Sequence, residues 1–342
     1  MEATVDIERY ADQGRCVAHI DGRVVFVRFA LPGERVRIEL DEPTNRNDRF
    51  WTGEVVEVLE PSPDRVEPLW PLAAPLAMGG GAGGADLIHV SLEGQERWKE
   101  ATLKDVMKRL GHVDLDDVPV YAMPGDEQAH GLHWRTRIEM VTDDEGRPSM
   151  RRRGTHVRVP IDTMPLATRA VLEVAEMNGV WDGNLPENAQ IRIAVPEPRV
   201  DAEQIADPEA LRKAIGRNYA IMVDGKVRHG SRALKETIMV DGKPFEYTVD
   251  AGGFWQMHRE APMVLPQYVI DQIRETPGDR APRNGRNLVI WDLYSGSGLF
   301  TLPLATLLDD RAKLVSIEGA KDAVANARRN LRNAGIHTVQ AL

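Results

Sequence analysis

The sequence of 342 residues predicts a multidomain protein that combines a β-barrel with α/β folding. Three observations carry this prediction. Short apolar–polar alternations separated by turn residues fill the first part of the chain, as in small barrels. Strand and helix patterns are mixed in the middle. Near the end, an apolar strand leads into a Gly-x-Gly turn and an apolar helix, which is typical of a Rossmann-like domain. We expect three domains, over residues 1–62, 63–250 and 251–342.

Composition excludes several classes of protein. The chain is 42% hydrophobic and 28% charged, which is ordinary for a soluble globular protein. No apolar run approaches the roughly 20 residues of a membrane span, and the acidic start lacks the apolar core of a signal peptide. The single cysteine, Cys16, excludes an internal disulfide and favours a reducing compartment, so we expect a cytoplasmic protein without membrane contact. The net charge of −10 excludes coating of nucleic acid by bulk charge, so RNA binding requires local basic patches.

The first domain is predicted as an OB-like barrel. Turn residues such as Asp21-Gly22 and Pro32-Gly33 separate its alternating segments. OB-like barrels commonly bind oligonucleotides, although a purely structural module is the alternative. The alternating segments are residues 4–8, 22–29, 34–40 and 53–59.

The central domain is predicted as α+β. Pro61 and Pro63 mark a linker, and residues 71–85 form a loop rich in glycine, alanine and proline. Helical periodicity runs over residues 92–110 and over 164–178, and strand patterns fill much of the stretch from about 120 to 250.

Arginines concentrate on the predicted central strands. A solvated strand face and a phosphate-binding face are both open interpretations, and the clustering in an acidic protein supports the second. These arginines are Arg135, Arg137, Arg151, Arg152, Arg153 and Arg158.

A short aromatic segment follows the predicted central strands. Phe254 and Trp255 are either core aromatics or a pair that flanks a flipped base, whose edge Gln256 would read through hydrogen bonds. A helix is expected over residues 261–275.

The most informative stretch lies in the last domain. The apolar run 288–290 leads to Asp292 and then to the turn glycines Gly296 and Gly298, and a second apolar run ends at Glu318. Glycines let a backbone approach a nucleotide-like ligand, and an acidic residue after the second strand can accept hydrogen bonds from ribose hydroxyls. Phe300-Thr301 replace the third glycine of dinucleotide folds. The segment resembles the first motif of S-adenosylmethionine (SAM) dependent methyltransferases, and a plain strand–helix turn is the alternative.

The order of these pieces resembles one family, the TRAM-domain RNA (uracil-5-)-methyltransferases, which act on tRNA or ribosomal RNA. Residues 12–27, 31–36 and 60–68 are similar to TRAM segments, and the resemblance covers essentially the whole chain. It implies a TRAM barrel, a central α+β domain and a Rossmann-like SAM methyltransferase domain, with RNA as partner and SAM as cofactor. No obligate protein partner is evident.

The resemblance also implies site residues. It makes Gln256, Tyr294 and Glu318 SAM-contacting positions. In this family a cysteine thiolate adds to C6 of uracil, C5 takes the methyl group, and a base removes the C5 proton before the cysteine leaves. The expected cofactor site is Gln256, Asp292, Tyr294, Ser295, Gly296, Gly298 and Glu318. The expected RNA contacts are Arg135, Arg137, Arg152, Arg153, Phe254 and Trp255.

The chain departs from the family at an iron–sulfur site. Many members hold a cluster with four cysteines, whose positions correspond to Trp70, Ala82, Ala85 and Met164. None of these side chains is a thiolate, so we predict that no iron–sulfur cluster binds, and no other metal is expected.

A second departure concerns catalysis. The family's catalytic cysteine and general base are expected beyond Leu342, and Cys16 falls in the barrel, so no catalytic residue is assigned. The sequence therefore predicts an incomplete methyltransferase domain and a chain that does not methylate by itself. The alternatives are a non-catalytic RNA-binding protein with a vestigial methyltransferase domain, and a methyltransferase with another substrate. The target uridine, the RNA class and the oligomeric state stay open.

Overall fold

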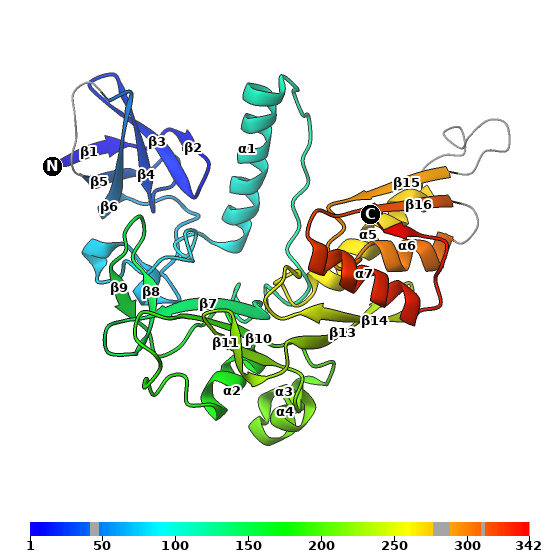
Figure 1. Cartoon of the computed structure of the whole chain (residues 1–342). Helices are drawn as coiled ribbons and strands as arrows, with labels where there is room; N and C mark the ends of the chain where they lie inside the picture. The colour runs from blue at the N-terminus through cyan, green and yellow to red at the C-terminus, as the bar shows by residue number, and fades with distance from the viewer. Residues whose placement is uncertain (42–47, 276–287, 309–311, 342) are drawn as a thin grey trace. The chain divides into compact units, whose positions relative to one another are not determined.

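The computed structural model describes residues 1–41, 48–275, 288–308 and 312–341 (Figure 1). Contacts divide the chain into two units. The first comprises Met1–His130 and Ser149–Pro160, and the second comprises Gly131–Pro148 and Ile161–Leu342. The division into three domains remains a prediction.

A six-stranded sheet forms the N-terminal part of the first unit. Its order is β1-β5-β6-β4-β3-β2, and only β4 and β6 run parallel. β1 also contacts β3, so the sheet curls on itself as the predicted barrel requires. Alternate residues such as Val25, Val27, Val36 and Ile38 form the core, because successive side chains of a strand point to opposite faces. The strands are β1 Glu2–Asp6, β2 Arg9–Tyr10, β3 Arg15–Ile20, β4 Arg23–Arg28, β5 Arg35–Leu40 and β6 Phe50–Glu60.

Helix α1, Leu92–Gly111, packs on the barrel. Ser91 caps it by accepting a hydrogen bond from the Gly94 amide. Its buried Trp98 donates to the carbonyl of Ala11 at 3.2 Å. Two short 3-10 helices, η1 Pro71–Ala73 and η2 Leu76–Met78, lie in the glycine-rich loop, and β8 Pro148–Arg151 pairs with β9 Arg158–Pro160.

An antiparallel sheet opens the second unit. Strands β12, β11, β10 and β7 are neighbours in that order, and β13 and β14 form a separate hairpin. The strands are β7 Arg137–Thr142, β10 Gln190–Ala194, β11 Ala220–Val223, β12 Lys226–Gly230, β13 Ala233–Val240 and β14 Lys243–Asp250. The helices here are α2 Arg169–Met177, α3 Ala202–Ala206, α4 Pro208–Ile215 and α5 Ala261–Glu275.

The C-terminal part has the predicted strand–helix alternation. Parallel strands β15 Leu288–Leu293, β16 Ala312–Ile317 and β17 Gln340–Ala341 are interleaved with α6 Thr301–Leu308 and α7 Lys321–Asn333. This confirms the Rossmann-like α/β expectation.

Helix α7 is tied to β14, and the two lie side by side in Figure 1. The side-chain oxygen of Asn330 accepts from the Thr248 amide at 2.8 Å, and its amide nitrogen donates to the Ser297 carbonyl at 3.1 Å. Tyr247 is buried and donates to the Leu299 carbonyl at 3.0 Å. These bonds satisfy buried polar groups and fix the glycine turn against the β-hairpin.

Within the described ranges, no helix has both the length and the apolar character to span a membrane.

Candidate functional site

The turn after β15 has a backbone that favours glycine. Tyr294, Gly296 and Gly298 have φ values of 59°, 57° and 88°, all in the left-handed region. Glycine adopts this region without strain, whereas tyrosine does so at some cost in free energy. Tyr294 is 91% exposed, so the turn presents its side chain to solvent rather than to the core. Its expected contact with the cofactor remains a prediction.

Glu318 joins this turn to the end of β16. One carboxylate oxygen accepts from the Gly296 amide and the other from the Ala320 amide, both at 2.8 Å. These amide donors hold the pKa of Glu318 below its ordinary value, so the side chain is a carboxylate at neutral pH. A carboxylate has about four acceptor positions, so Glu318 can still accept from ribose hydroxyls.

Asp292 and Ser295 face inward instead. Asp292 accepts a hydrogen bond from the Thr301 hydroxyl at the start of α6, and burial raises its pKa while the Thr301 hydroxyl and amide oppose this. Ser295 is 5% exposed and accepts from the Ser316 hydroxyl at 2.7 Å. The two side chains therefore brace the turn. Their expected contact with the cofactor remains a prediction.

Gln256 lies in the loop between β14 and α5, and its side chain is half-buried. No hydrogen bond within the described residues joins it to the glycine turn, so its role with the cofactor also remains a prediction.

The aromatic pair before α5 is split between surface and core. Phe254 is 73% exposed, whereas Trp255 is 3% exposed and packs against Tyr247 with ring centroids 5.2 Å apart. This corrects the expectation that both rings flank a base, because a buried indole has no free face for stacking. Phe254 alone can stack.

Arg137 is an interior residue rather than a surface contact. Its side chain is 7% exposed, and Nη1 donates to the carbonyls of Asp250 and Gly253 at 3.1 and 2.9 Å. Nη2 lies 3.9 Å from the buried carboxylate of Glu236. Burial lowers the pKa of Arg137, and Glu236 opposes this shift. The expected direct RNA contact is corrected, because Arg137 instead holds the loop that carries Phe254.

Arg135, two residues before the start of β7 at Arg137, differs from Arg137 in exposure. It is partly exposed and lines a cavity of about 360 Å³ together with Arg137, Arg192 and Phe254. Sequence reasoning missed Arg192, although a lone arginine within the apolar strand β10 was a signal that could have found it.

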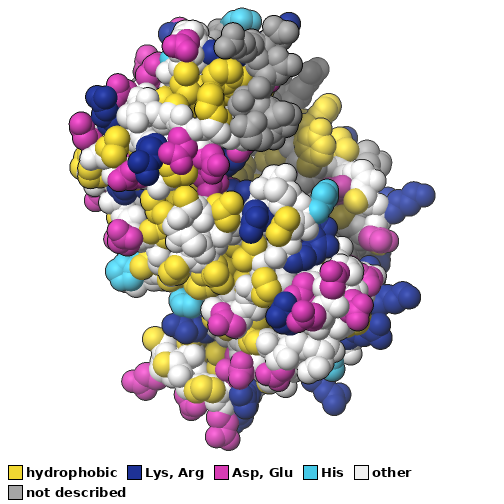
Figure 2. Space-filling model, turned by 90° about the vertical axis from the view of Figure 1, so that its left-hand side faces the viewer, with side chains coloured by type: hydrophobic (Ala, Val, Ile, Leu, Met, Phe, Trp, Pro, Cys, Tyr) yellow, Lys and Arg dark blue, Asp and Glu magenta, His cyan; other side chains and the backbone are white. Residues whose placement is uncertain are grey.

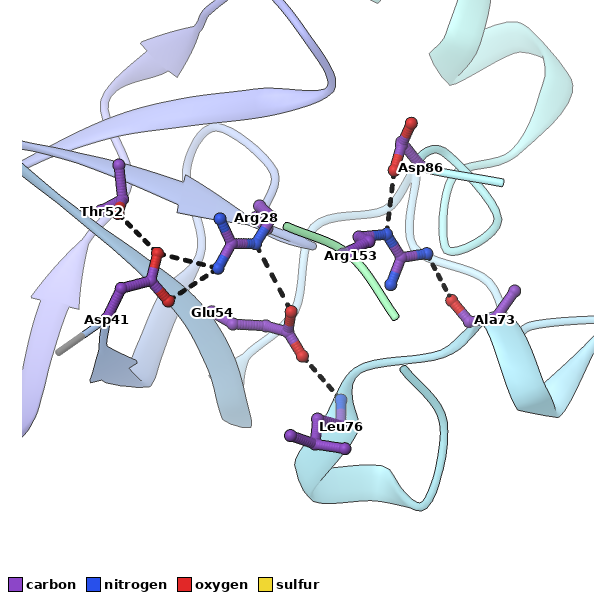
Figure 3. Close-up of polar contacts among 8 residues, drawn as sticks. All are labelled: Arg28, Asp41, Thr52, Glu54, Ala73, Leu76, Asp86 and Arg153. Atoms are coloured by element: carbon purple, nitrogen blue, oxygen red, sulfur yellow. Dashed lines mark hydrogen bonds and ion pairs between the residues drawn. The ribbon is translucent and has the colours of Figure 1, made fainter. Parts of the chain in front are cut away.

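Arg152 and Arg153 belong to the first unit, where Arg153 holds the glycine-rich loop together. It donates to Asp86 at 2.9 Å and to the Ala73 carbonyl at 2.8 Å (Figure 3). Its guanidinium carbon also lies 4.2 Å from the centroid of the Phe29 ring. Its side chain is 10% exposed. Arg153 is thus a structural residue in this unit, which corrects its expected RNA contact, while the expectation for Arg152 remains a prediction.

A second contact fixes the same loop to the barrel. Arg28 binds Asp41 at 2.7 Å and Glu54 at 3.5 Å, and Glu54 accepts from the Leu76 amide at 2.6 Å (Figure 3). Thr52 also donates to Asp41. These contacts attach this part of the loop to the barrel.

The four positions of the family's iron–sulfur site are filled by packing residues. Trp70 and Ala82 are buried in the first unit, Ala85 is half-buried there, and Met164 is buried in the second. In the part of the chain that the structure describes, no group of three His, Cys, Asp or Glu residues could hold a metal ion. The absence of a cluster stays a prediction.

Cys16 is buried in the barrel core and donates to the Ala30 carbonyl at 3.2 Å. Burial raises its pKa strongly, so it remains a thiol. Its sulfur is not placed to attack a nucleic acid.

Charge on the surface is mixed rather than segregated. Figure 2 shows acidic and basic side chains interspersed over the face that it displays, in keeping with the net charge of −10. Basic sites for RNA therefore have to be local.

Comparisons with known proteins place the chain in a family. Residues 2–59 match the TRAM domain. An uncharacterized RNA methyltransferase of Bifidobacterium longum is 60% identical over 341 residues, which cover 100% of this chain and 75% of that protein. The 23S rRNA (uracil(1939)-C(5))-methyltransferase RlmD of Chromohalobacter salexigens is 30% identical, over 99% of this chain and 71% of the relative.

A solved structure supports the fold. The tRNA (uracil-54, C5)-methyltransferase of Pyrococcus abyssi, in complex with S-adenosyl-L-homocysteine, matches with a TM-score of 0.58 at 14% identity, over 99% of this chain and 79% of that one. Together with the sequence relatives and the SAM-type turn, these matches show that the chain belongs to the TRAM-domain RNA (uracil-5-)-methyltransferase family.

Proposed function

We propose that this RNA methyltransferase uses SAM to methylate C5 of a uridine in ribosomal RNA or tRNA. The observation that supports the proposal is the bond between the Glu318 carboxylate and the Gly296 amide at 2.8 Å, because a carboxylate beside a left-handed glycine turn can accept hydrogen bonds from the ribose hydroxyls of SAM. The uracil-C5 methyltransferase among the relatives supports the choice of target atom.

The residues of the turn fit SAM. Gly296 has open space where a side chain would be, Tyr294 offers an exposed ring, and Glu318 has acceptor capacity left. Gly298 supplies the second left-handed position of the turn. Gln256, Asp292 and Ser295 complete the proposed cofactor site. SAM supplies an electrophilic methyl group there, while the protein binds and orients the donor.

Methylation at C5 requires a nucleophile that adds to C6 of the ring. Cys16 does not serve, because it is buried and its pKa is raised. In this proposal the residues of the two sites bind SAM and RNA, and none of them is the nucleophile.

For RNA, we propose the TRAM barrel, Arg135, Arg152 and Phe254 as contacts. Trp255, Arg137 and Arg153 support the surrounding structure instead. The partner is RNA, and we place the activity in the cytoplasm.

A second candidate function is RNA binding without catalysis, which the match of residues 2–59 to the TRAM domain supports. Calorimetric titration with SAM separates the two. Saturable binding that Glu318→Ala weakens supports the methyltransferase. RNA binding by the intact chain without any heat from SAM, at concentrations well above those of free SAM in cells, supports the second candidate and overturns the first.

Transfer of a labelled methyl group from SAM to ribosomal RNA or tRNA is the direct assay. Label at C5 of uridine, found by nucleoside analysis, supports the proposed target. Label on another atom or another base contradicts it.

A further inference from the structure

A cavity of about 600 Å³ lies among helices α2, α3 and α4 of the second unit. Helix α4 contacts both α2 and α3, and the three helices lie together in Figure 1. Among the described residues, the cavity shares no lining residue with the proposed cofactor site or with the cavity that Arg135 and Phe254 line. It is therefore a separate feature, which we call the helical groove.

The floor of the helical groove is apolar. Leu172 of α2, Ile205 of α3 and Leu211 of α4 line it, together with Trp181, which follows α2. Leu211 is buried, whereas the other three side chains are only half-buried. A partner that covers these side chains removes apolar surface from water, which favours association.

The charged side chains that line the groove are mostly acidic. They are Asp162, Arg169, Glu173 and Glu176. Glu173 is neutralised by an ion pair with Arg212 of α4. Asp162 and Glu176 are exposed, and neither belongs to an ion pair within the described residues. The lining therefore leaves two carboxylates against one arginine.

The neighbouring segment adds negative charge beside the groove. Residues 201–209 span α3 and the start of α4 and contain no lysine or arginine, but they contain the exposed acidic residues Asp201, Glu203, Asp207 and Glu209. The next basic residues, Arg212 and Lys213, follow in α4, and the first of them is the partner of Glu173. Because this surface attracts cations and repels anions, it favours a cationic partner over a chain of phosphates.

We propose that the helical groove docks a basic segment of another protein. An apolar side chain of that segment contacts Leu172, Trp181 and Ile205, and lysine or arginine residues on either side of it face Asp162 and Glu176. Grooves with an apolar floor and a charged rim bind amphipathic segments in this manner. The inference goes beyond the proposed function and does not depend on it.

The openness of the groove favours a peptide over a small organic cation. A small ligand buries roughly 70–90% of its surface in its pocket. Asp162, Glu176 and Pro208 line the helical groove and are exposed, so its rim is open to solvent. A segment of polypeptide can lie along such a rim and place one side chain on the apolar floor.

The test is peptide display on the full 342-residue chain. Short random peptides are selected for binding, and the enriched ones are synthesised with a fluorescent label for anisotropy. We expect an apolar or aromatic residue flanked by lysine or arginine, and an affinity that falls as salt is raised, because the rim charges are exposed. Absence of enrichment, or enriched peptides without basic residues, would overturn the proposal.

A pair of charge reversals locates the binding. Glu176→Lys places a like charge opposite the basic peptide and should weaken its binding by about tenfold or more. Glu187→Lys makes the same change at an exposed position outside the groove and should leave the affinity unchanged. Equal affinities in these two variants would overturn the proposal.

Leu172→Ala tests the apolar floor and should weaken peptide binding severalfold, because it removes contact surface while the rim charges stay. Thermal unfolding confirms that each variant is folded. Wild-type affinity in a folded Leu172→Ala variant would mean that the peptide does not enter the groove, and would overturn the proposal.

Sedimentation of the chain alone separates a partner protein from a second copy of this chain. A monomer, together with peptide binding that Glu176→Lys weakens, supports a separate partner. A dimer that Glu176→Lys dissociates would make the second copy the occupant and overturn the proposal. All of these measurements are made without SAM or RNA, so their outcome is independent of the proposed function.

Discussion

The carboxylate of Glu318 accepts the amide of Gly296 at 2.8 Å, although the two residues are 22 positions apart in the chain. This bond joins the ends of two parallel strands, β15 and β16, at the edge where ligands of such sheets bind. One side chain thus orders the glycine turn and keeps acceptor positions, which the proposed function assigns to the ribose of SAM.

Glu318→Ala should weaken SAM binding by roughly 1–3 kcal/mol, because it removes both the acceptor for ribose and the anchor of the turn. Calorimetry measures the change. Glu203→Ala, on exposed helix α3, is the matched control and should bind as the wild type does. Asp292→Ala should weaken binding on the same scale, because the turn no longer has its bond to Thr301. Unchanged affinity in both site variants would remove the cofactor site assignment.

Substitution of two neighbouring aromatic residues, Phe254 and Trp255, should have different effects: the first should change RNA affinity and the second should change stability. Phe254→Ala should lower RNA affinity by about 1–3 kcal/mol because it removes the stacking surface, with little change in unfolding. Trp255→Ala should instead lower the free energy of unfolding by about 3–5 kcal/mol, because it empties a buried site. Anisotropy and denaturant unfolding give the two readouts. Equal loss of RNA affinity with intact stability in Trp255→Ala would contradict this division.

The pH dependence of the free energy of unfolding should show the raised pKa of Glu236. Burial raises its pKa from 4.5 to about 7, against an opposing effect of Arg137. Between these values the unfolded chain releases a proton that the folded chain retains, so this group's contribution to the free energy of unfolding falls as pH rises.

Glu236→Gln abolishes that fall. Relative to the wild type, the variant should therefore be more stable at about pH 8 than at about pH 5. Urea unfolding at both pH values provides the measurement, with the exposed strand residue Glu246→Gln as control. The same stability difference at both pH values would argue against a raised pKa.

Arg153→Ala should loosen the glycine-rich loop. It removes the donors to Asp86 and to the Ala73 carbonyl, at a cost of roughly 1–3 kcal/mol. Hydrogen exchange of the amides over residues 71–85 should become faster. Arg151→Ala, two residues earlier with an exposed side chain, should leave exchange unchanged. Equal protection in the two variants would mean that other contacts hold the loop.

Protein purified without oxygen should be colourless and free of iron. Trp70, Ala82, Ala85 and Met164 provide no thiolates, which a cluster requires. Visible absorption and iron analysis measure this. Stoichiometric iron with a charge-transfer band in the visible range would refute the expectation.

The sequence predicted the features that depend on local pattern. Alternation in strands such as β5 fixed which residues form the barrel core, because a strand turns successive side chains to opposite faces. Gly296 and Gly298 marked the left-handed turn, because glycine is the residue that adopts positive φ without strain. The order of motifs identified the family.

The sequence by itself determined the kinds of fold, the position of the left-handed glycine turn and the family. Only the tertiary structure decided which of two adjacent residues faces inward. Phe254 and Trp255 are both large aromatic residues, and the sequence does not distinguish their environments. Packing against Tyr247 buries Trp255. Arg137 and Arg153 carry the charge expected of RNA contacts, yet they donate hydrogen bonds to the carbonyls of Gly253 and Ala73, which are far from them in the sequence. The physical reason is that burial and hydrogen-bond partners arise from segments far apart in the chain, which local periodicity does not encode.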